Sequence, residues 1–299
     1  MVDGLYDKTS KISFSAYGDD FLKYFGEYHR IIRELGTEIH TLYGTHRRLD
    51  RLVLVDDDTL QNWEFELKNI SKDTLTRLWQ YNNLKSAEIG KITDSFIISF
   101  ANPNLCDEKV EIGQSIVFAP IIKYLKMMEL PKKLNIIETK VNNNEKIAIE
   151  DELTLIFVAL SVKDKYKEDM VKRVCNVLEK IDYIEDYRRI VIDSLIFFQI
   201  ENFVKSRNIQ KELNEVVDMQ MSVEELFIQT EREYEFDSGF NKGVEEGKKE
   251  GKKEGRDEIK EEIIVNMLRD SIDDKAIQKF TNCTAKDLEK IKIKYSDTL

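Results

Sequence analysis

Three carboxylates, Asp50, Glu64 and Glu66, have the residue types and spacing of a site that could bind a divalent cation. Side chains on a β-strand alternate between its two faces, so Glu64 and Glu66 would share one face while Trp63 and Phe65 occupy the other. Two neighbouring carboxylates repel each other unless a positive charge compensates them. The D-x₁₃-E-x-E spacing is a weak signal by itself, and its meaning depends on the elements that position it.

A β-hairpin would bring Asp50 to the two glutamates. The strand-like runs 48–55 and 61–67 flank a cluster of turn-forming residues, which is the pattern of a hairpin. If residues 57–59 form its three-residue tip, Asp50 faces Glu66 and the three carboxylates share one face. Mg²⁺ binds in such places through one or two carboxylates and keeps several waters, so Mg²⁺ or Mn²⁺ is the expected cofactor.

This arrangement suits hydrolysis of a phosphodiester bond, because a bound cation stabilises charge on the phosphate oxygens and activates water. Asp50 and Glu64 are the expected metal ligands, with the carbonyl of Phe65 as a third. Glu66 is expected to hold the attacking water or to act as the general base. The three carboxylates are therefore the candidate catalytic residues.

Basic residues flank Asp50 and could engage neighbouring phosphates through charge-assisted hydrogen bonds. They are His46, Arg47, Arg48 and Arg51. A simpler interpretation has the carboxylates facing solvent, with Arg48 or Arg51 pairing across the hairpin with a glutamate.

The elements that must position these residues form an α/β pattern in the first 150 residues. Apolar residues at spacings of three and four predict a helix from Ser15 to about Leu35, after an irregular start. Further along, the sequence predicts a helix at 73–88 and strands at 94–100, 115–120, 133–141 and 146–149.

The remainder of the chain reads as mostly helical. The expected division is an α/β core at 1–150, a packed helical extension at 151–222, a charged segment at 223–262 and a small helical hairpin at 263–299. Thr284 is expected to cap the last helix. This hairpin is either structural or, with its lysines, an element that reads DNA.

Glycines recur every four residues in the charged segment, at Gly239, Gly243, Gly247, Gly251 and Gly255. The segment is either a solvated linker, because glycine weakens a helix by about 1 kcal/mol, or a helix with a bare stripe. Such a stripe would let a partner helix approach closely in a homo-oligomer.

Bulk composition narrows the class of protein. The net charge of −11 argues against a protein that coats nucleic acid nonspecifically, but a nuclease needs only a local basic patch. Three widely spaced cysteines predict neither a disulfide framework nor a zinc site. The N-terminus lacks the apolar core of a signal peptide, and the longest apolar run, 153–162, is about half of a membrane span. A cytoplasmic protein without membrane contact is expected.

The chain resembles the PD-(D/E)XK nucleases, and within them the Rpn-type recombination-promoting nucleases and related transposases. The resemblance is carried by Arg48-Leu49-Asp50 on the first strand, by Glu64-Phe65-Glu66 on the second, and by Arg77 and Tyr81 one turn apart on the following helix. Sequence motifs support the resemblance over residues 20–100. Over residues 235–295 it rests on the charged, glycine-containing composition of the tail.

This resemblance implies a restriction-endonuclease-like core, a mixed sheet flanked by helices. It also implies a Mg²⁺- or Mn²⁺-dependent DNA endonuclease associated with mobile elements and recombination. Arg48, Arg51, Arg77 and Tyr81 would contact phosphate or support the metal face. The alternative is a catalytically inactive relative that serves as an interaction or DNA-binding module.

One position departs from the family pattern. Glu66 stands where most members of the superfamily have Lys and the nearer family has Gln. A positive charge for the transition state must then come from elsewhere, and Lys68 and Lys85 are candidates. Some members of the superfamily carry an extra acidic residue on or after the first helix. In this chain it could be Glu27, Glu34 or Glu38, and the sequence does not distinguish among them.

Overall fold

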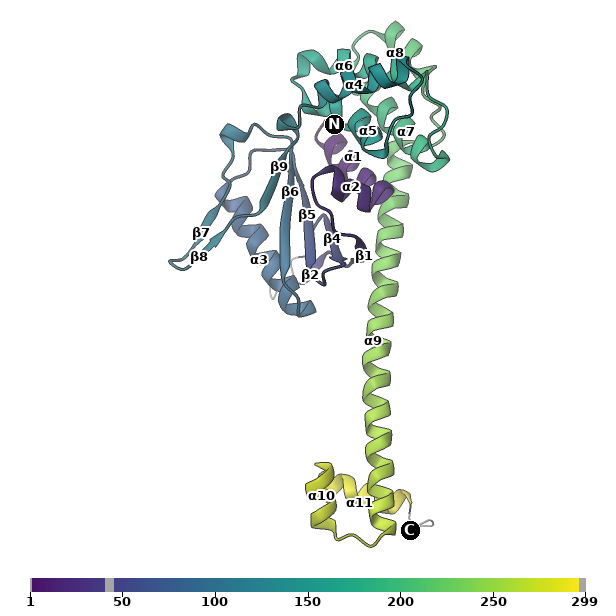
Figure 1. Ribbon diagram of the computed structural model, residues 1–299. Helices are drawn as coiled ribbons and strands as arrows, with labels where there is room; N and C mark the ends of the chain where they lie inside the picture. Colours follow the sequence, from purple (N-terminus) through teal and green to yellow (C-terminus); the bar gives the residue numbers. More distant parts are fainter. Residues whose placement is uncertain (1, 41–45, 296–299) are drawn as a thin grey trace. The chain divides into compact units, whose positions relative to one another are not determined.

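A mixed five-stranded β-sheet flanked by helices forms the centre of this α/β protein (Figure 1). The computed structural model describes residues 2–40 and 46–295. The strand order is β1-β4-β5-β6-β9, in which β1, β4 and β5 are antiparallel and β6 and β9 run parallel to β5. The strands are β1 (Ile31–Leu35), β4 (Arg51–Val55), β5 (Leu60–Glu66), β6 (Thr93–Ser99) and β9 (Ile121–Tyr124).

Two small antiparallel pairs accompany the central sheet. They are β2 (Glu38–His40) with β3 (His46–Arg48), and β7 (Val110–Ile112) with β8 (Ile116–Phe118). The strand expected at 48–55 is therefore interrupted, because β3 ends at Arg48 and β4 begins at Arg51. Asp50 lies in the bend between them rather than in a regular strand.

The β4–β5 hairpin has its tip one residue earlier than expected. The N–H of Val55 donates to the carbonyl of Thr59 over 3.0 Å, which leaves residues 56–58 as the tip. The Asp57 carboxylate accepts from the Thr59 N–H at 3.0 Å, and Asp58 takes a left-handed φ of 72°. Arg51 is paired with Trp63, so the register differs by two residues from the expectation that placed Asp50 opposite Glu66. A shift of two keeps every side chain on its expected face.

Two N-terminal helices cover one face of the sheet, where the sequence predicted irregular structure followed by one long helix. They are α1 (Val2–Tyr17) and α2 (Asp19–Tyr24), and the expectation of a helix over 15–35 is wrong. Gly18 and Gly26 adopt φ values of 48° and 81°, which end a helical path, and Ile31 then pairs with β4 as a strand.

Aromatic packing holds these two helices to the sheet. Phe14 and Phe21 approach Trp63 with ring centroids 6.2 and 6.1 Å away, and Trp63 stacks on Phe96 at 4.5 Å. Phe65 lies in the same buried cluster. Trp63 and Phe65 therefore fill the face covered by α1 and α2. The alternate residues of β5, including Glu64, lie on the opposite face of the sheet.

That other face is covered by α3 (Lys72–Ile89), close to the expected 73–88. The Ser71 side chain accepts from the N–H of Thr74 at the start of the helix, and Gly90 ends it in the left-handed conformation. The amide of Asn82 on α3 accepts from Asn62 on β5 at 2.9 Å. The helix is thereby held over the strand that carries the glutamates.

Helices follow the sheet from residue 130 onward. The strand expected at 133–141 is wrong, since α4 spans Leu130–Asn142 and buries Leu134, Ile137 and Val141 at helical spacing. The strand expected at 146–149 is also absent from the described structure, where α5 begins at Ile149. The further elements are η1 (Pro103–Leu105), η2 (Leu125–Met127), α5 (Ile149–Ser161), α6 (Asp164–Leu178), α7 (Asp186–Phe203) and α8 (Arg207–Asn214).

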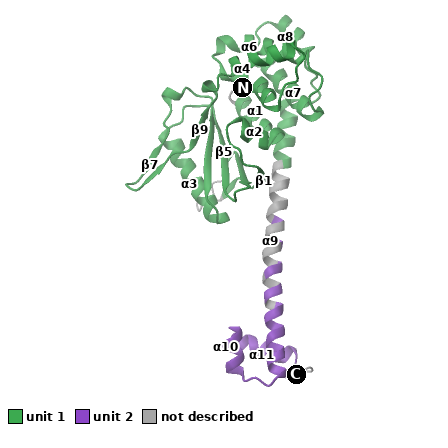
Figure 2. Ribbon diagram, in the orientation of Figure 1, with its two compact units in different colours: residues 1–239 green, residues 240–299 purple. Residues whose placement is uncertain are grey.

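The chain divides into two compact units, residues 1–239 and 240–299 (Figure 2). The second contains the last part of α9 (Val223–Arg269), α10 (Asp274–Thr281) and α11 (Ala285–Lys294) around a small core of Ile264, Ile277, Cys283 and Leu288. The Thr284 side chain accepts from the N–H of Asp287, which confirms the expected cap. Within the described residues, no helix combines the length and apolarity needed to cross a membrane.

The glycine repeat lies within α9. A Cβ added at Gly243, Gly247, Gly251 or Gly255 would meet nothing within 4 Å. Packing inside the described chain therefore does not require glycine at these four positions. The side chains next to Gly239 lie outside the described residues.

Candidate functional site

Asp50 and Glu64 are joined by hydrogen bonds at the start of β4. The backbone N–H of Asp50 donates to Oε1 of Glu64 over 3.3 Å. The Asp50 Oδ2 atom accepts from the backbone N–H of Phe65 over 3.0 Å. The bend after β3 thus turns the Asp50 carboxylate onto β5, beside the two expected glutamates.

Glu64 is buried, and none of the described side chains provides it with a cation. Its residue is 9% exposed, and no Lys or Arg among the described side chains lies within ion-pair distance of it. Burial, and then the negative charge of Asp50, raise the pKa of Glu64 well above its usual range. A buried carboxylate beside a second carboxylate favours either a proton or an added cation.

Lys11 of α1 contacts the Asp50 carboxylate directly. Its Nζ atom lies 2.9 Å from Oδ1 of Asp50 and 3.0 Å from Oδ1 of Asp7, and its side chain is only 15% exposed. Burial lowers the pKa of Lys11, but Asp50 and Asp7 outweigh burial, so the pKa is raised. Lys11 therefore carries a fixed positive charge at the site.

The sequence interpretation missed Lys11 because it treated residues 1–15 as irregular. A signal was present, since Asp7 and Lys11 are four residues apart, the spacing of an ion pair on one helix face. Asp7 is also the additional acidic residue beside this site. Glu27 instead lies near His29, at 3.7 Å, and Glu34 and Glu38 belong to β1 and β2.

Glu66 lies at the end of β5 and pairs with α3. The Arg77 guanidinium is 3.2 Å from its Oε1 atom, and the Glu66 side chain is 22% exposed. Burial raises the pKa of Glu66 while Arg77 opposes that shift, and Asp50 adds to it. The negative charge of Asp50 therefore reaches Glu66, which agrees with the two carboxylates lying on one face of the sheet.

Tyr81 and the candidate lysines have separate surroundings. Tyr81 packs against a buried apolar cluster that includes Leu52, Leu54 and Leu60, so it supports the sheet. Lys85 pairs with Glu88 at 3.0 Å on its own helix. Lys68 acts on Glu66 by favouring its charged form.

Arg51 and Arg48 meet on a glutamate that the sequence interpretation did not identify. The Arg51 side chain is fully buried, and its Nη2 atom lies 2.6 Å from Oε1 of Glu231 on α9. Arg48 Nη2 lies 3.3 Å from Oε2 of the same glutamate. Burial keeps Arg51 away from a phosphate and makes it a support for the bend. The side chains of His46 and Arg47 lie outside the described residues.

Asp50 and Glu64 offer a metal ion two carboxylates, which is fewer side-chain ligands than a preformed metal site with three or more would have. No group of three or more His, Cys, Asp or Glu side chains in the described part of the chain is arranged to hold a metal ion. Lys11 on Asp50 and Arg77 on Glu66 provide a physical reason, since each holds a carboxylate by direct charge pairing. Asp50 and Glu64 still supply the hard oxygen donors that Mg²⁺ prefers.

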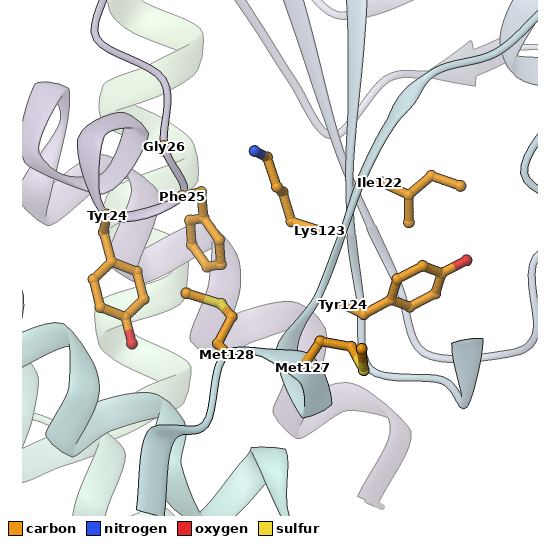
Figure 3. A pocket seen from close by; sticks show the side chains of 8 residues that line it. All are labelled: Tyr24, Phe25, Gly26, Ile122, Lys123, Tyr124, Met127 and Met128. Carbon is orange, nitrogen blue, oxygen red and sulfur yellow. The ribbon is translucent and has the colours of Figure 1, made fainter. Parts of the chain in front are cut away.

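A separate hollow of about 490 Å³ lies between the end of α2 and β9 (Figure 3). Lys123 extends into it toward Gly26. Phe65, Ile98 and Lys123 are neighbours in the sheet register, so this hollow is on the face opposite to Glu64. Its lining contains no carboxylate and does not offer a second cation site; it consists of Tyr24, Phe25, Gly26, Ile122, Lys123, Tyr124, Met127 and Met128.

Comparison with known proteins does not identify a family or a function for this chain. No model of a protein family, no curated protein and no solved structure matches the chain. The chemistry of the site therefore follows from the contacts of Asp50, Glu64, Glu66 and Lys11.

Proposed function

We propose that this protein is a metal-dependent DNA endonuclease of the PD-(D/E)XK type that hydrolyses phosphodiester bonds in recombination or transposition. The order of elements supports the proposal. An antiparallel β1-β4-β5 meander is followed by α3 and by β6 parallel to β5. Asp50 precedes β4, and Glu64-Phe65-Glu66 closes β5, which is the placement that the family resemblance implies.

The observation that carries the proposal is the buried Glu64 carboxylate, which contacts Asp50 and has no cation beside it among the described side chains. Within the described side chains its nearest charged neighbours are acidic, and burial withdraws it from water. Lys11 offsets the charge of Asp50, but an ionised, buried Glu64 is costly without a counter-charge of its own. Asp50 and Glu64, with the Phe65 carbonyl, would hold Mg²⁺ or Mn²⁺. When bound, the ion supplies Lewis-acid stabilisation of the phosphate oxygens and lowers the pKa of water.

Lys11 supplies the positive charge that Glu66 cannot. It stays protonated because Asp50 and Asp7 stabilise its charged form. An ammonium group fixed at the edge of the site can stabilise negative charge that develops on a phosphate oxygen. We assign this role to Lys11 in preference to Lys85, which pairs with Glu88.

Glu66 and Arg77 act together in this proposal. The Glu66 carboxylate orients a water, and Arg77 holds that carboxylate in place over 3.2 Å. Arg77 is 52% exposed, so its guanidinium can also contact a DNA phosphate. DNA would approach along the end of β5 and the first turns of α3.

The second candidate function is a catalytically inactive interaction or DNA-binding module. It is favoured by Lys11, because an ammonium already bound to Asp50 could replace a metal permanently. The absence of a formed metal group among the described residues agrees with it as well. A direct assay of cleavage separates the two candidates.

The test is nicking of supercoiled plasmid by the full-length protein in Mg²⁺ and in Mn²⁺. We expect metal-dependent nicking that Asp50→Asn and Glu64→Gln each abolish. Glu111→Gln changes an exposed carboxylate on β7 in the same way and should leave nicking unchanged. Absence of nicking by the wild-type protein in both metals would refute the endonuclease proposal in favour of the inactive module. Full activity of Asp50→Asn would instead refute the assignment of Asp50 as a ligand of the catalytic cation.

A further inference from the structure

The bend that carries Asp50 is held by a residue far along the chain. Arg51 Nη1 donates to the carbonyl of Asp50 over 3.0 Å, while its Nη2 atom contacts Glu231 at 2.6 Å. Arg51 is fully buried and Glu231 is 18% exposed on its side chain. A single guanidinium thus joins the Asp50 backbone to the first turns of α9.

Every polar group of Asp50 has a partner in this arrangement. Its carbonyl accepts from Arg51, its N–H donates to Glu64, and its carboxylate meets Lys11 and the N–H of Phe65. Arg51, Glu64 and Phe65 lie within 15 positions of Asp50 in the sequence. The contact between Arg51 and Glu231, in contrast, spans 180 positions. The position of the bend therefore depends on where α9 packs.

The beginning of α9 is firmly packed within the first unit. Val223, Leu226 and Thr230 are 4%, 0% and 1% exposed. Glu224 pairs with Lys8 of α1 at 2.7 Å. Glu231 follows one residue after this buried stripe, so its carboxylate is presented to Arg51 from a fixed helix.

We propose that Glu231 is a positioning residue for the cation site. It fixes the Arg51 guanidinium, which in turn sets the backbone of Asp50 so that its carboxylate lies beside Glu64. This inference rests on the proposed metal-dependent function and adds α9 as a structural part of the site. Outer partners of metal ligands typically contribute 10–100-fold to metal affinity.

Charge explains why a glutamate is needed at this position. A fully buried guanidinium is costly unless a negative group meets it with good geometry. Glu231 contacts both Arg51 and Arg48, so one carboxylate serves two guanidinium groups on either side of Asp50. Neutral glutamine keeps the shape of the side chain but lowers the strength of both contacts.

The test is calorimetric titration of full-length protein with Mn²⁺ alone. We expect Glu231→Gln to weaken Mn²⁺ binding by about 10-fold or more, and Arg51→Lys to do the same. The double variant should lose little more than the larger single loss, because both substitutions break one linkage. A melting curve for each variant confirms folding before titration.

Two controls on α9 separate positioning from general stability. Glu233→Gln alters an exposed carboxylate two positions further on, and Glu224→Gln removes the pair with Lys8. Both should bind Mn²⁺ as the wild type does, although Glu224→Gln should melt at a lower temperature. If Glu231→Gln does not fold, Glu231→Asp replaces it, and its shorter side chain should still weaken binding several-fold.

Three results would overturn the inference. Mn²⁺ affinity within twofold of wild type in the folded Glu231 variant would show that Glu231 does not position the site. An equal loss in Glu224→Gln would show that packing of α9 alone matters. Absence of Mn²⁺ binding by the wild-type protein would remove the proposed function together with the inference, whereas the first two results leave that function intact.

Discussion

The N–H of Asp50 donates to the Glu64 carboxylate over 3.3 Å, and the Asp50 carboxylate accepts from the N–H of the residue after Glu64 over 3.0 Å. This reciprocal contact bends the chain before β4 and brings two acidic groups together. Lys11 neutralises one of them from α1, and burial leaves the other without a partner cation among the described residues.

Glu64→Gln should stabilise the protein in the absence of metal. Burial and Asp50 raise the pKa of Glu64 above 4.5, so the folded state binds this proton more tightly than the unfolded state. Stability is then highest on the acid side and is lost as the pH rises toward the raised pKa. At pH 7 we therefore expect Glu64→Gln to melt at a higher temperature than the wild-type protein.

Thermal melting from pH 5 to pH 8 measures this effect. The wild-type melting temperature should fall with rising pH, and Glu64→Gln should show a smaller fall because this position no longer titrates. Some fall should remain, because other carboxyls with raised pKa values, such as Asp193, are unchanged. Identical pH slopes in the two proteins would mean that Glu64 is not held in the environment described here.

Lys11→Met should reduce metal-dependent DNA cleavage by about 10² or more, the usual loss when a fixed transition-state donor is removed. Lys11→Arg keeps the charge and should lose less. Initial rates of plasmid nicking at saturating Mn²⁺ give the comparison. Lys23→Met, on the half-exposed surface of α2, is the matched control. Wild-type rates in Lys11→Met would exclude Lys11 from the chemistry.

Glu66→Gln should keep cleavage within about 10-fold of the wild-type rate. Arg77 already pairs with this carboxylate, and a glutamine carbonyl can still accept a hydrogen bond from a water. Glu66→Ala should lose more, because nothing then orients that water. A loss of about 10² or more in Glu66→Gln, measured as the single-turnover rate, would instead identify Glu66 as the general base.

The shared face of the carboxylates could be predicted from sequence because it depends only on the alternation of a strand. The exact tip of the hairpin could not, since it depends on Asp57 accepting from Thr59 and on the positive φ of Asp58. The resulting shift of two residues left the face unchanged. Asp50 and Glu64 therefore lie next to each other as expected, although the predicted register was wrong.

The remaining partners depend on tertiary packing. Residues 31–35 continue the apolar spacing of a helix, yet pairing with β4 makes them a strand. The 133–141 segment is different, because Leu134, Ile137 and Val141 already have the local spacing of a helix face. Its helix could therefore have been predicted from sequence. Glu231 meets Arg51 across 180 positions, a contact that no local pattern signals.

The most direct measurement of the central claim is calorimetric titration of Mn²⁺ into the wild-type protein and into Asp50→Asn. The Asp50–Glu64 pair predicts a saturable site in the wild type that Asp50→Asn weakens clearly, since one of two carboxylate ligands is lost. Equal binding by both proteins, or no binding by the wild type, would contradict the claim that this pair holds a catalytic cation.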